Sequence, residues 1–404
     1  MVSRLTQSTK QMDAMLVFLA SKLTTPRIWW VVLLIWISAI VPARAASVNL
    51  RVAIEQDATQ VNVGSSKNAT VLDGMRNPIG EIQGMNGFTA QAKNGGVALD
   101  RWLSGAIWIV PKDNGVVWIG DRWYRGSVYV LPAGKGLTAI NYVDLEQYLY
   151  SVLGAEMSAG WPKEALKAQA VAARSYALYE MQNSSSQPFD LGDTAGWQVY
   201  NGVQAESAST QQAVSDTTGL VLAYNNQIIN AVFHSNAGGC TENVEDVWSQ
   251  PLPYLRTVKN NFDEGTSVSQ WSTTISASEL GNRLGVGTVR EIKILDKTPI
   301  CNRVKKLQVI GDRGMKEFNR DDEIRNALGL KSSLFTITSQ FQPVANKSGA
   351  KPVLSSITIN GRGFGHGLGM SQWGAYNMAR QGATYERILQ EYYKNTQIKP
   401  IEPR

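Results

Sequence analysis

The hydrophobic period of the chain changes at Tyr142, and this change constrains the fold more than any other feature. Before it, residues 46–140 alternate between apolar and polar side chains, as in VNLRVAI at 48–54, and glycines interrupt the alternation. A period of two residues is typical of strands with one buried face. After it, the spacing of an amphipathic helix appears at Leu145, Tyr148, Leu149 and Val152. The sequence therefore predicts an α+β fold, with helices packed on mixed β-sheet and a β-rich N-terminal region.

Further helices and strands follow this first helix. A second helix is predicted to begin near Pro162, because proline suits the first helical position, and to continue through an alanine-rich stretch to Met181. Residues 219–224 and 227–233 are typical of a hairpin that turns at Asn225-Asn226. We also expect a polar loop at 342–352, strands at 289–295, 304–310 and 357–359, and helices at 321–328, 371–381 and 384–393.

The N-terminal segment predicts the compartment. Residues 28–41 read IWWVVLLIWISAIV without a charge, Lys22 and Arg27 precede them, and Ala43-Arg44-Ala45 follows. This arrangement is typical of a secretory signal peptide. The apolar run is shorter than the ~20 residues that span a bilayer, so we expect cleavage after Ala45, with an uncleaved membrane anchor as the alternative. The body is then exported to the periplasm or cell wall, and it meets a membrane only through an uncleaved leader.

The leader also carries most of the net charge of +6. Five of the 39 basic residues and one of the 33 acidic residues lie in 1–45, which leaves the remainder with a net charge of +2. A nearly neutral body gives no electrostatic reason to expect nucleic-acid binding.

Among the acidic residues, Glu156 has the most suggestive setting. It lies in LGAEM at 153–157, between the two predicted helices, and Trp161 follows closely. Apolar neighbours disfavour the charged carboxylate and raise its pKa, and a general acid needs a raised pKa near neutral pH. The helix N-terminus near Pro162 would act in the opposite direction. Glu156 is therefore a candidate general acid, and an exposed loop glutamate is the alternative.

The two histidines of the chain both follow predicted strands and lie in Gly-rich stretches. His234 is in FHSNAGGC and His366 is in GFGHGLG. Because glycine has no Cβ, the backbone in these stretches can approach a ligand closely. Both histidines are candidate ligand contacts, and a satisfied core or surface histidine is the ordinary alternative.

The two cysteines, Cys240 and Cys301, leave three alternatives open. They could form one disulfide, which export permits, or both could be free thiols. Alternatively, His234 and Cys240 could hold zinc together with Cys301 brought in by the fold. Three protein ligands with an open position are more typical of a catalytic zinc site than of a closed structural one.

Two long segments of the chain stand out together. The first is YLYSVLGAEMSAGWPKEALKAQAVAARSYALY at 148–179, and the second is GRGFGHGLGMSQWGAYNMARQGATYERILQEYYKNT at 361–396. They resemble the stage II sporulation protein D family, which includes the LytB amidase enhancers, and the resemblance spans roughly 125–400. It divides the chain into a signal peptide (1–45), a β-rich N-terminal region (46–124) and a catalytic domain like that of this family (125–400).

The resemblance implies an exported peptidoglycan lytic transglycosylase. Such an enzyme cleaves the β-1,4 bond between N-acetylmuramic acid and N-acetylglucosamine and leaves a 1,6-anhydro end. The catalytic glutamate of the family maps onto Glu156, which agrees with the choice made from the residues. Hydrolysing glycosidases usually need two carboxylates. The resemblance implies that one glutamate, Glu156, is enough, because it acts first as acid and then as base.

The resemblance also suggests which residues surround the catalytic glutamate. Some family members bind zinc through a histidine and cysteines of the stretch that holds His234 and Cys240, while Cys301 lies far downstream of the family's second cysteine. Arg174 could hold sugar or carboxylate groups bidentately, with a structural ion pair as the alternative. Tyr200 is a candidate for stacking on substrate or hydrogen-bonding to it. The remaining candidates, for substrate contact or for holding loops, are His366, Ser371 and Gln372.

The main functional alternative belongs to another class. A wall-binding protein could enhance a separate N-acetylmuramoyl-L-alanine amidase without turnover of its own. The expected partners are peptidoglycan glycan strands in both cases, and a cell-wall amidase in the second.

Overall fold

The computed structural model describes residues 48–248, 250–343 and 352–401. The chain divides into two units, 1–46 and 47–404, and the account below concerns the second. The predicted signal peptide at 28–41 and most of the loop predicted at 342–352 lie outside the described residues. None of the helices in the described ranges is long and apolar enough to cross a membrane.

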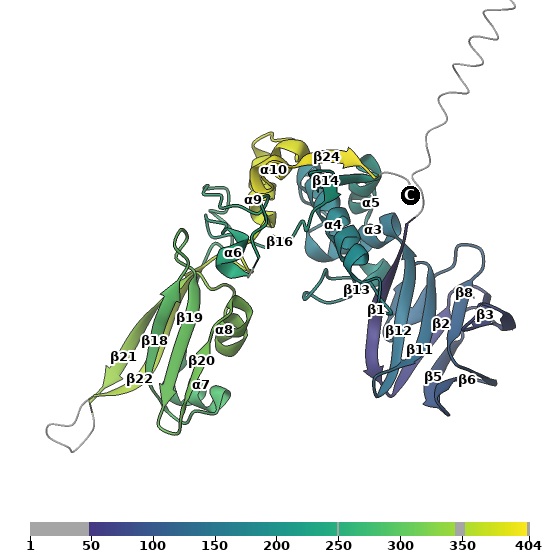
Figure 1. Cartoon of the computed structure of the whole chain (residues 1–404), viewed down its shortest axis with the longest axis horizontal. Coiled ribbons are helices and arrows are strands. Elements are labelled where there is room, and N and C mark those ends of the chain that lie inside the picture. Colours follow the sequence, from purple (N-terminus) through teal and green to yellow (C-terminus); the bar gives the residue numbers. More distant parts are fainter. Residues whose placement is uncertain (1–47, 249, 344–351, 402–404) are drawn as a thin grey trace, which may run out of the picture. The chain divides into compact units, whose positions relative to one another are not determined.

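Two sheets form the N-terminal part, as the alternating pattern predicts (Figure 1). The first has the order β13-β1-β12-β11-β8-β3-β4 and the second β10-β9-β2-β5-β6-β7. The strands of the first span Leu191–Gly192 (β13), Asn49–Ala58 (β1), Gly136–Asp144 (β12), Ser127–Ala133 (β11), Ile107–Pro111 (β8), Ala69–Asp73 (β3) and Pro78–Ile82 (β4). Those of the second span Arg122–Tyr124 (β10), Val117–Ile119 (β9), Gln60–Ser65 (β2), Gly87–Lys93 (β5), Gly96–Leu99 (β6) and Trp102–Ser104 (β7).

The larger sheet crosses the boundary that we drew between residues 124 and 125. Strand β12 pairs with β1, where Leu50 lies opposite Val143, and also with β11, where Tyr129 lies opposite Ile140. The pairing of β1 with β13 is parallel, so the sheet is mixed as predicted. The β-rich region and the first strands after residue 125 therefore share one sheet.

Helices α3 and α4 begin and end close to their predicted positions. Helix α3 (Leu145–Glu156) begins at Asp144, whose carboxylate accepts hydrogen bonds from the backbone N–H groups of Glu146 and Gln147. Helix α4 (Lys163–Asn183) follows Pro162, and its alanines are buried. Because alanine side chains are small, the neighbouring elements approach this helix closely. The shorter helices are η1 (Gly202–Ala205), α5 (Ala208–Asp216), α6 (Val244–Val247), α9 (Gln372–Arg380) and α10 (Tyr385–Tyr392).

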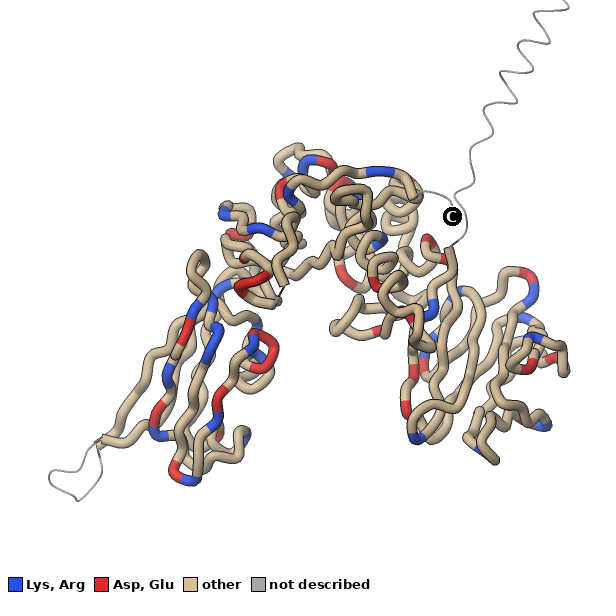
Figure 2. Tube along the Cα trace, viewed as in Figure 1, with Lys and Arg blue, Asp and Glu red and all other residues tan. Residues whose placement is uncertain are grey.

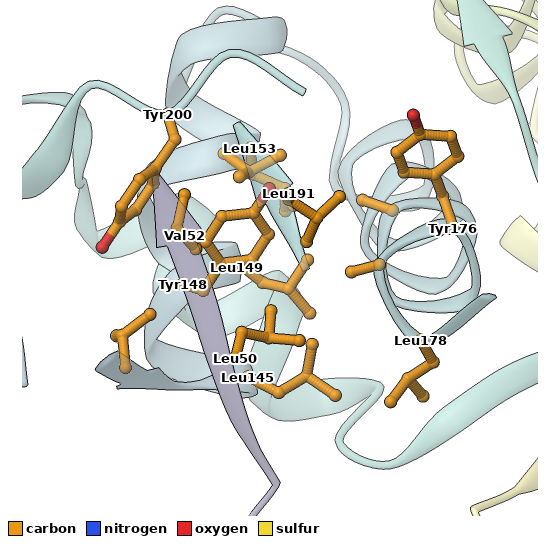
Figure 3. Packing of buried hydrophobic residues seen from close by; sticks show 14 of the residues in the cluster. Leu50, Val52, Leu145, Tyr148, Leu149, Leu153, Tyr176, Leu178, Leu191 and Tyr200 are labelled. Atoms are coloured by element: carbon orange, nitrogen blue, oxygen red, sulfur yellow. The ribbon is translucent and has the colours of Figure 1, made fainter. Parts of the chain in front are cut away.

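Helix α3 is fixed against the large sheet by its apolar face. Figure 3 shows Tyr148 and Leu149 of this helix beside Leu50 of β1 and Leu191 of β13. All four side chains are buried in one continuous core. Glu156, the last residue of α3, is therefore carried on an anchored helix.

Two small sheets connect distant parts of the chain. The predicted hairpin at Asn225-Asn226 is present, and both asparagines have positive φ, as a tight hairpin turn requires. Strands β16 and β23 pair in parallel and place His234 opposite Ser371. The strands of these sheets are β14 (Leu220–Tyr224), β15 (Gln227–Ile228), β24 (Gln397–Pro400), β16 (Phe233–His234) and β23 (Met370–Ser371).

A second core lies between two three-stranded sheets and two helices. Its sheets have the orders β17-β22-β21 and β18-β19-β20. Figure 2 shows acidic and basic residues interspersed along these strands. Lys306 of β19 and Glu317 of β20 form an ion pair with a distance of 3.1 Å. The elements are β17 (Gln270–Ser276), α7 (Ala277–Leu284), β18 (Val289–Lys297), β19 (Val304–Gly311), β20 (Met315–Phe318), α8 (Asp321–Leu328), β21 (Phe335–Gln342) and β22 (Val353–Arg362).

Candidate active site

A cavity of about 310 Å³ brings together residues from both segments that resemble the family. This volume is at the lower end of the ~300–1,000 Å³ range of ligand sites, so one sugar ring is a suitable occupant. The described residues that line it are Glu156, Tyr176, Ala195, Gly196, Trp197, Val199, Val232, Phe233, His234, Ser235, Trp248, Arg325, Phe364, Gly365, His366 and Gln372.

Glu156 lies in this cavity at the C-terminal end of α3. Its Oε1 accepts a hydrogen bond from the Val199 backbone N–H at 2.8 Å, and its Oε2 accepts one from the Gln372 side-chain amide at 3.3 Å. Burial raises the pKa of Glu156, and these two donors oppose the rise because they favour the carboxylate. The negative end of the α3 dipole also disfavours the carboxylate. The net effect is a pKa of Glu156 above the ordinary value of glutamate, which is the direction that a general acid needs.

His366 lines the cavity, and both of its ring nitrogens are used within the protein. Nδ1 accepts a hydrogen bond from the Leu368 backbone N–H, and Nε2 pairs with the Phe233 carbonyl, each at 3.0 Å. Because a carbonyl only accepts, Nε2 carries the proton and the ring is neutral. Burial lowers the pKa of His366 to about 4. Of the two roles that the sequence left open, this geometry shows the holding of a loop.

His234 lies beside His366, with 5.3 Å between the ring centroids. Its Nδ1 pairs with the Leu368 carbonyl at 3.0 Å, whereas its buried Nε2 has no hydrogen-bond partner among the described residues. Burial lowers the pKa of His234 well below the usual range of histidine.

Ser371, for which the sequence left substrate contact and the holding of a loop open, does not line the cavity. Its fully buried hydroxyl donates to Asp263 and accepts from the Gly374 backbone N–H at 3.1 Å, so it caps helix α9. The Asp263 carboxylate also accepts from the Ala237 and Gly239 backbone N–H groups. Ser371 thus fixes the start of the helix on which Gln372 is the first residue. Gln372 itself contacts Glu156.

Arg174 was also predicted to bind substrate, and this prediction is wrong for the described structure. Its side chain is 0 % exposed and forms a bidentate ion pair with Glu146, with Nε–Oε1 and Nη2–Oε2 distances of 2.8 and 2.6 Å. A further bond reaches the Leu220 carbonyl. The structural ion pair, which was the alternative reading, is what the fold uses, because a buried guanidinium needs partners on every side.

Tyr200 is likewise part of the core and does not line the cavity. Figure 3 shows its ring near that of Tyr148. Tyr200 is 1 % exposed, the two ring centroids are 4.7 Å apart, and the Tyr200 hydroxyl donates to Asn141 Oδ1 at 2.8 Å. The prediction of a substrate-stacking tyrosine at this position is therefore wrong.

The two cysteines form a disulfide, one of the three alternatives that the sequence left open. In this state neither Cys240 nor Cys301 offers a thiolate to a metal, so the residues do not fit the zinc set predicted with His234. Within the described ranges, no three His, Cys, Asp or Glu side chains are grouped to hold a metal ion.

The aromatic residues around the cavity were missed by the sequence reasoning. Trp197, Trp248 and Phe364 are 37, 41 and 43 % exposed, although each lines the cavity. Apolar rings left in contact with water at a ligand site are suited to stacking on sugar faces. A tryptophan in a polar, Gly-rich stretch, such as Trp197 in DTAGWQ, is the signal that could have identified them.

Two family models match separate parts of the chain. A family model described as stage II sporulation protein matches residues 133–224, and a domain of unknown function (DUF8618) matches residues 257–369. Stage II sporulation protein D of Bacillus subtilis is 35% identical over 282 residues, which cover 65% of this chain and 77% of that protein. An uncharacterized protein of Brachyspira hyodysenteriae is 33% identical over 65% of this chain and 68% of its own length.

A further relative carries a different name. The amidase enhancer of Bacillus subtilis is 30% identical over 62% of this chain, and the match covers 40% of the enhancer. Both names belong to the group that the two long segments resemble. With 35% identity across more than two thirds of stage II sporulation protein D, the chain belongs to the stage II sporulation protein D family.

Proposed function

We propose that the chain is an exported peptidoglycan lytic transglycosylase that acts in the periplasm or at the cell wall. One observation carries the proposal: a single carboxyl group with a raised pKa, Glu156, lies in a cavity that suits one sugar ring. The exposed rings of Trp197, Trp248 and Phe364 at the same cavity support a carbohydrate ligand. The leader at 28–41 supports export.

In the proposed reaction, Glu156 acts twice. Its proton passes to the glycosidic oxygen while the bond from that oxygen to C1 of N-acetylmuramic acid breaks. The 6-hydroxyl oxygen of the same sugar then bonds to C1, and its proton returns to the Glu156 carboxylate. A 1,6-anhydro end is left, no water is consumed, and the glutamate recovers its starting form.

The number of carboxylates supports this reaction over hydrolysis. Among the described residues that line the cavity, Glu156 is the only aspartate or glutamate. Hydrolysing glycosidases usually place a second carboxylate across the bond to activate water or to attack the sugar. A nucleophile within the substrate removes that requirement. The Gln372 amide favours the carboxylate at the moment when the proton has left.

The test uses residues 46–404 and two variants, Glu156→Gln and Glu180→Gln. Glu180 is a matched control, because burial also raises its pKa but it does not line the cavity. Purified glycan strands, with and without stem peptides, are incubated with each protein, and the products are identified by mass spectrometry. We expect anhydro ends from the parent and from Glu180→Gln, and a rate at least ~100-fold lower from Glu156→Gln. Reducing ends would show a hydrolase and contradict the proposal.

The amidase enhancer among the relatives favours a second candidate, a wall-binding protein without turnover that assists a cell-wall amidase. The same experiment separates the two. Binding of glycan strands without any cleavage, together with faster release of stem peptides when a cell-wall amidase is added, would favour the enhancer.

A further inference from the structure

The protonation state of His234 follows from its hydrogen bonds. Nδ1 lies 3.0 Å from the Leu368 carbonyl oxygen, which only accepts, so Nδ1 carries a proton. A neutral imidazole carries one proton, so Nε2 presents a lone pair. Burial holds the pKa of this ring well below its usual range, which keeps it neutral. The side chain therefore offers one fixed acceptor.

That acceptor is buried and faces no donor of the protein. His234 is 5 % exposed and lines the same cavity as Glu156, yet Nε2 has no hydrogen-bond partner among the described residues. A buried polar atom without a partner destabilises the folded state, and native structures keep few of them. His366, only one ring away, has both nitrogens bonded. Because His234 lines the cavity, its Nε2 is available to accept a hydrogen bond from a ligand there.

The surrounding backbone holds the ring in this position. A Cβ at Gly365, whose φ is +110°, would come within 2.7 Å of the His234 Cβ, so only glycine permits this contact. The bridge between β16 and β23 sets His234 opposite Ser371, and the next residue, Gln372, donates to Glu156. Through Ser371 and Gln372, the backbone therefore fixes His234 relative to the Glu156 carboxyl group.

We propose that Nε2 of His234 accepts a hydrogen bond from a hydroxyl or acetamido N–H group of the sugar held beside Glu156. The identity of the ligand rests on the proposed function. An N-acetylated sugar ring offers several such donors, and a neutral imidazole takes one of them without competing for the proton that Glu156 transfers. His234 is then a substrate-binding residue, in place of the metal ligand that the sequence predicted.

The first test is spectroscopic and takes advantage of the two-histidine composition. Glu156→Gln protein labelled with ¹⁵N-histidine is titrated with an oligosaccharide prepared from glycan strands without stem peptides. We expect Nε2 of His234 to give an unprotonated, pyridine-type signal that moves towards the protonated range on binding. The His366 signals are an internal reference and should move less. A protonated Nε2 in the free protein, or no movement at saturation, would overturn the proposal.

The second test uses two substitutions that separate the nitrogens of the ring. Asparagine at 234 retains a donor near Nδ1 for the Leu368 carbonyl but loses the acceptor, whereas glutamine carries an amide oxygen towards the position of Nε2. In the Glu156→Gln background, we expect His234→Asn to weaken oligosaccharide binding about three- to tenfold, the effect of one hydrogen bond. We expect His234→Gln to recover part of the lost affinity. The melting temperature of His234→Asn should equal that of the parent, so that a loss of affinity does not reflect unfolding. Equal binding by the parent and His234→Asn would overturn the proposal.

The two experiments test the role of His234 and the proposed function separately. Loss of affinity in His234→Asn supports the proposal even where the parent protein cleaves nothing and the proposed function fails. Normal affinity in His234→Asn, with anhydro products from the parent, refutes the proposal and leaves the proposed function standing. A metal analysis completes the test, because zinc bound at one equivalent and lost in His234→Asn would show that Nε2 serves a metal.

Discussion

The side-chain amide of Gln372 donates a hydrogen bond of 3.3 Å to Oε2 of Glu156, although the two residues lie 216 positions apart. Gln372 is the first residue of α9, and Ser371 both caps that helix and bonds to Asp263. The orientation of the Glu156 carboxyl group therefore depends on both long segments that resemble the family. It also depends on a buried aspartate that lies in neither of them.

Replacing Gln372 by leucine should raise the pKa of Glu156 further. The amide favours the carboxylate, so its loss leaves burial less opposed. Since the proposed reaction starts from the protonated acid, we expect the alkaline limb of the pH–rate profile to move to higher pH. Gln381→Leu, an exposed position at the other end of α9, is the control. A limb that stays in place or moves to lower pH in Gln372→Leu would contradict the geometry.

The free energy of unfolding should depend on pH because of the raised pKa of Glu156. Burial raises its pKa in the folded state above that of the unfolded chain. The resulting contribution to stability is complete below the ordinary pKa of glutamate and is lost as the pH rises through the folded-state pKa. Glutamine does not titrate, so Glu156→Gln should gain stability relative to the parent as the pH rises. Urea unfolding of both proteins from pH 4 to pH 8 measures this difference, and a constant difference would refute the expectation.

The sequence predicted the helices and the hairpin well, because hydrophobic periodicity and turn residues depend on neighbours in the sequence. The hairpin at Asn225-Asn226 and the helix at 321–328 are present where the pattern places them. Glu156 was found because its apolar neighbours are adjacent in sequence. Arg174 and Tyr200 were misassigned because their partners, Glu146 and Asn141, lie in other elements, and only the fold shows that these pairs form.

Substituting Arg174 should affect stability and leave the cavity intact. Arg174→Met removes the guanidinium that binds the Glu146 carboxylate and the Leu220 carbonyl, and leaves Glu146 with only the Gly219 backbone N–H as a donor among the described residues. Glu146 is 21 % exposed, so we expect a loss at the lower end of the range for broken buried pairs, about 3 kcal/mol. Chemical denaturation measures this loss, and Arg290→Met, an exposed arginine on β18, is the control. The folded fraction should bind glycan strands normally. Weak binding of glycan strands by Arg174→Met at unchanged stability would show instead that Arg174 contacts the substrate.

The disulfide should stabilise the protein through the loop that it closes. Cys240 and Cys301 are separated by 61 positions, and a loop of that length corresponds to about 4 kcal/mol of loop-closure entropy in the unfolded chain. The bond joins a buried loop at 240 to the connection between β18 and β19, where Arg303 donates to the Ala237 and Cys240 carbonyls. We expect the double variant Cys240→Ser/Cys301→Ser to unfold at lower urea concentration than the oxidised parent. Dithiothreitol should destabilise the parent but not the variant.

Zinc added to the reduced parent provides the decisive comparison, because recovery of the lost stability would show that the thiolates bind a metal. No recovery would leave the disulfide as the functional state of the pair.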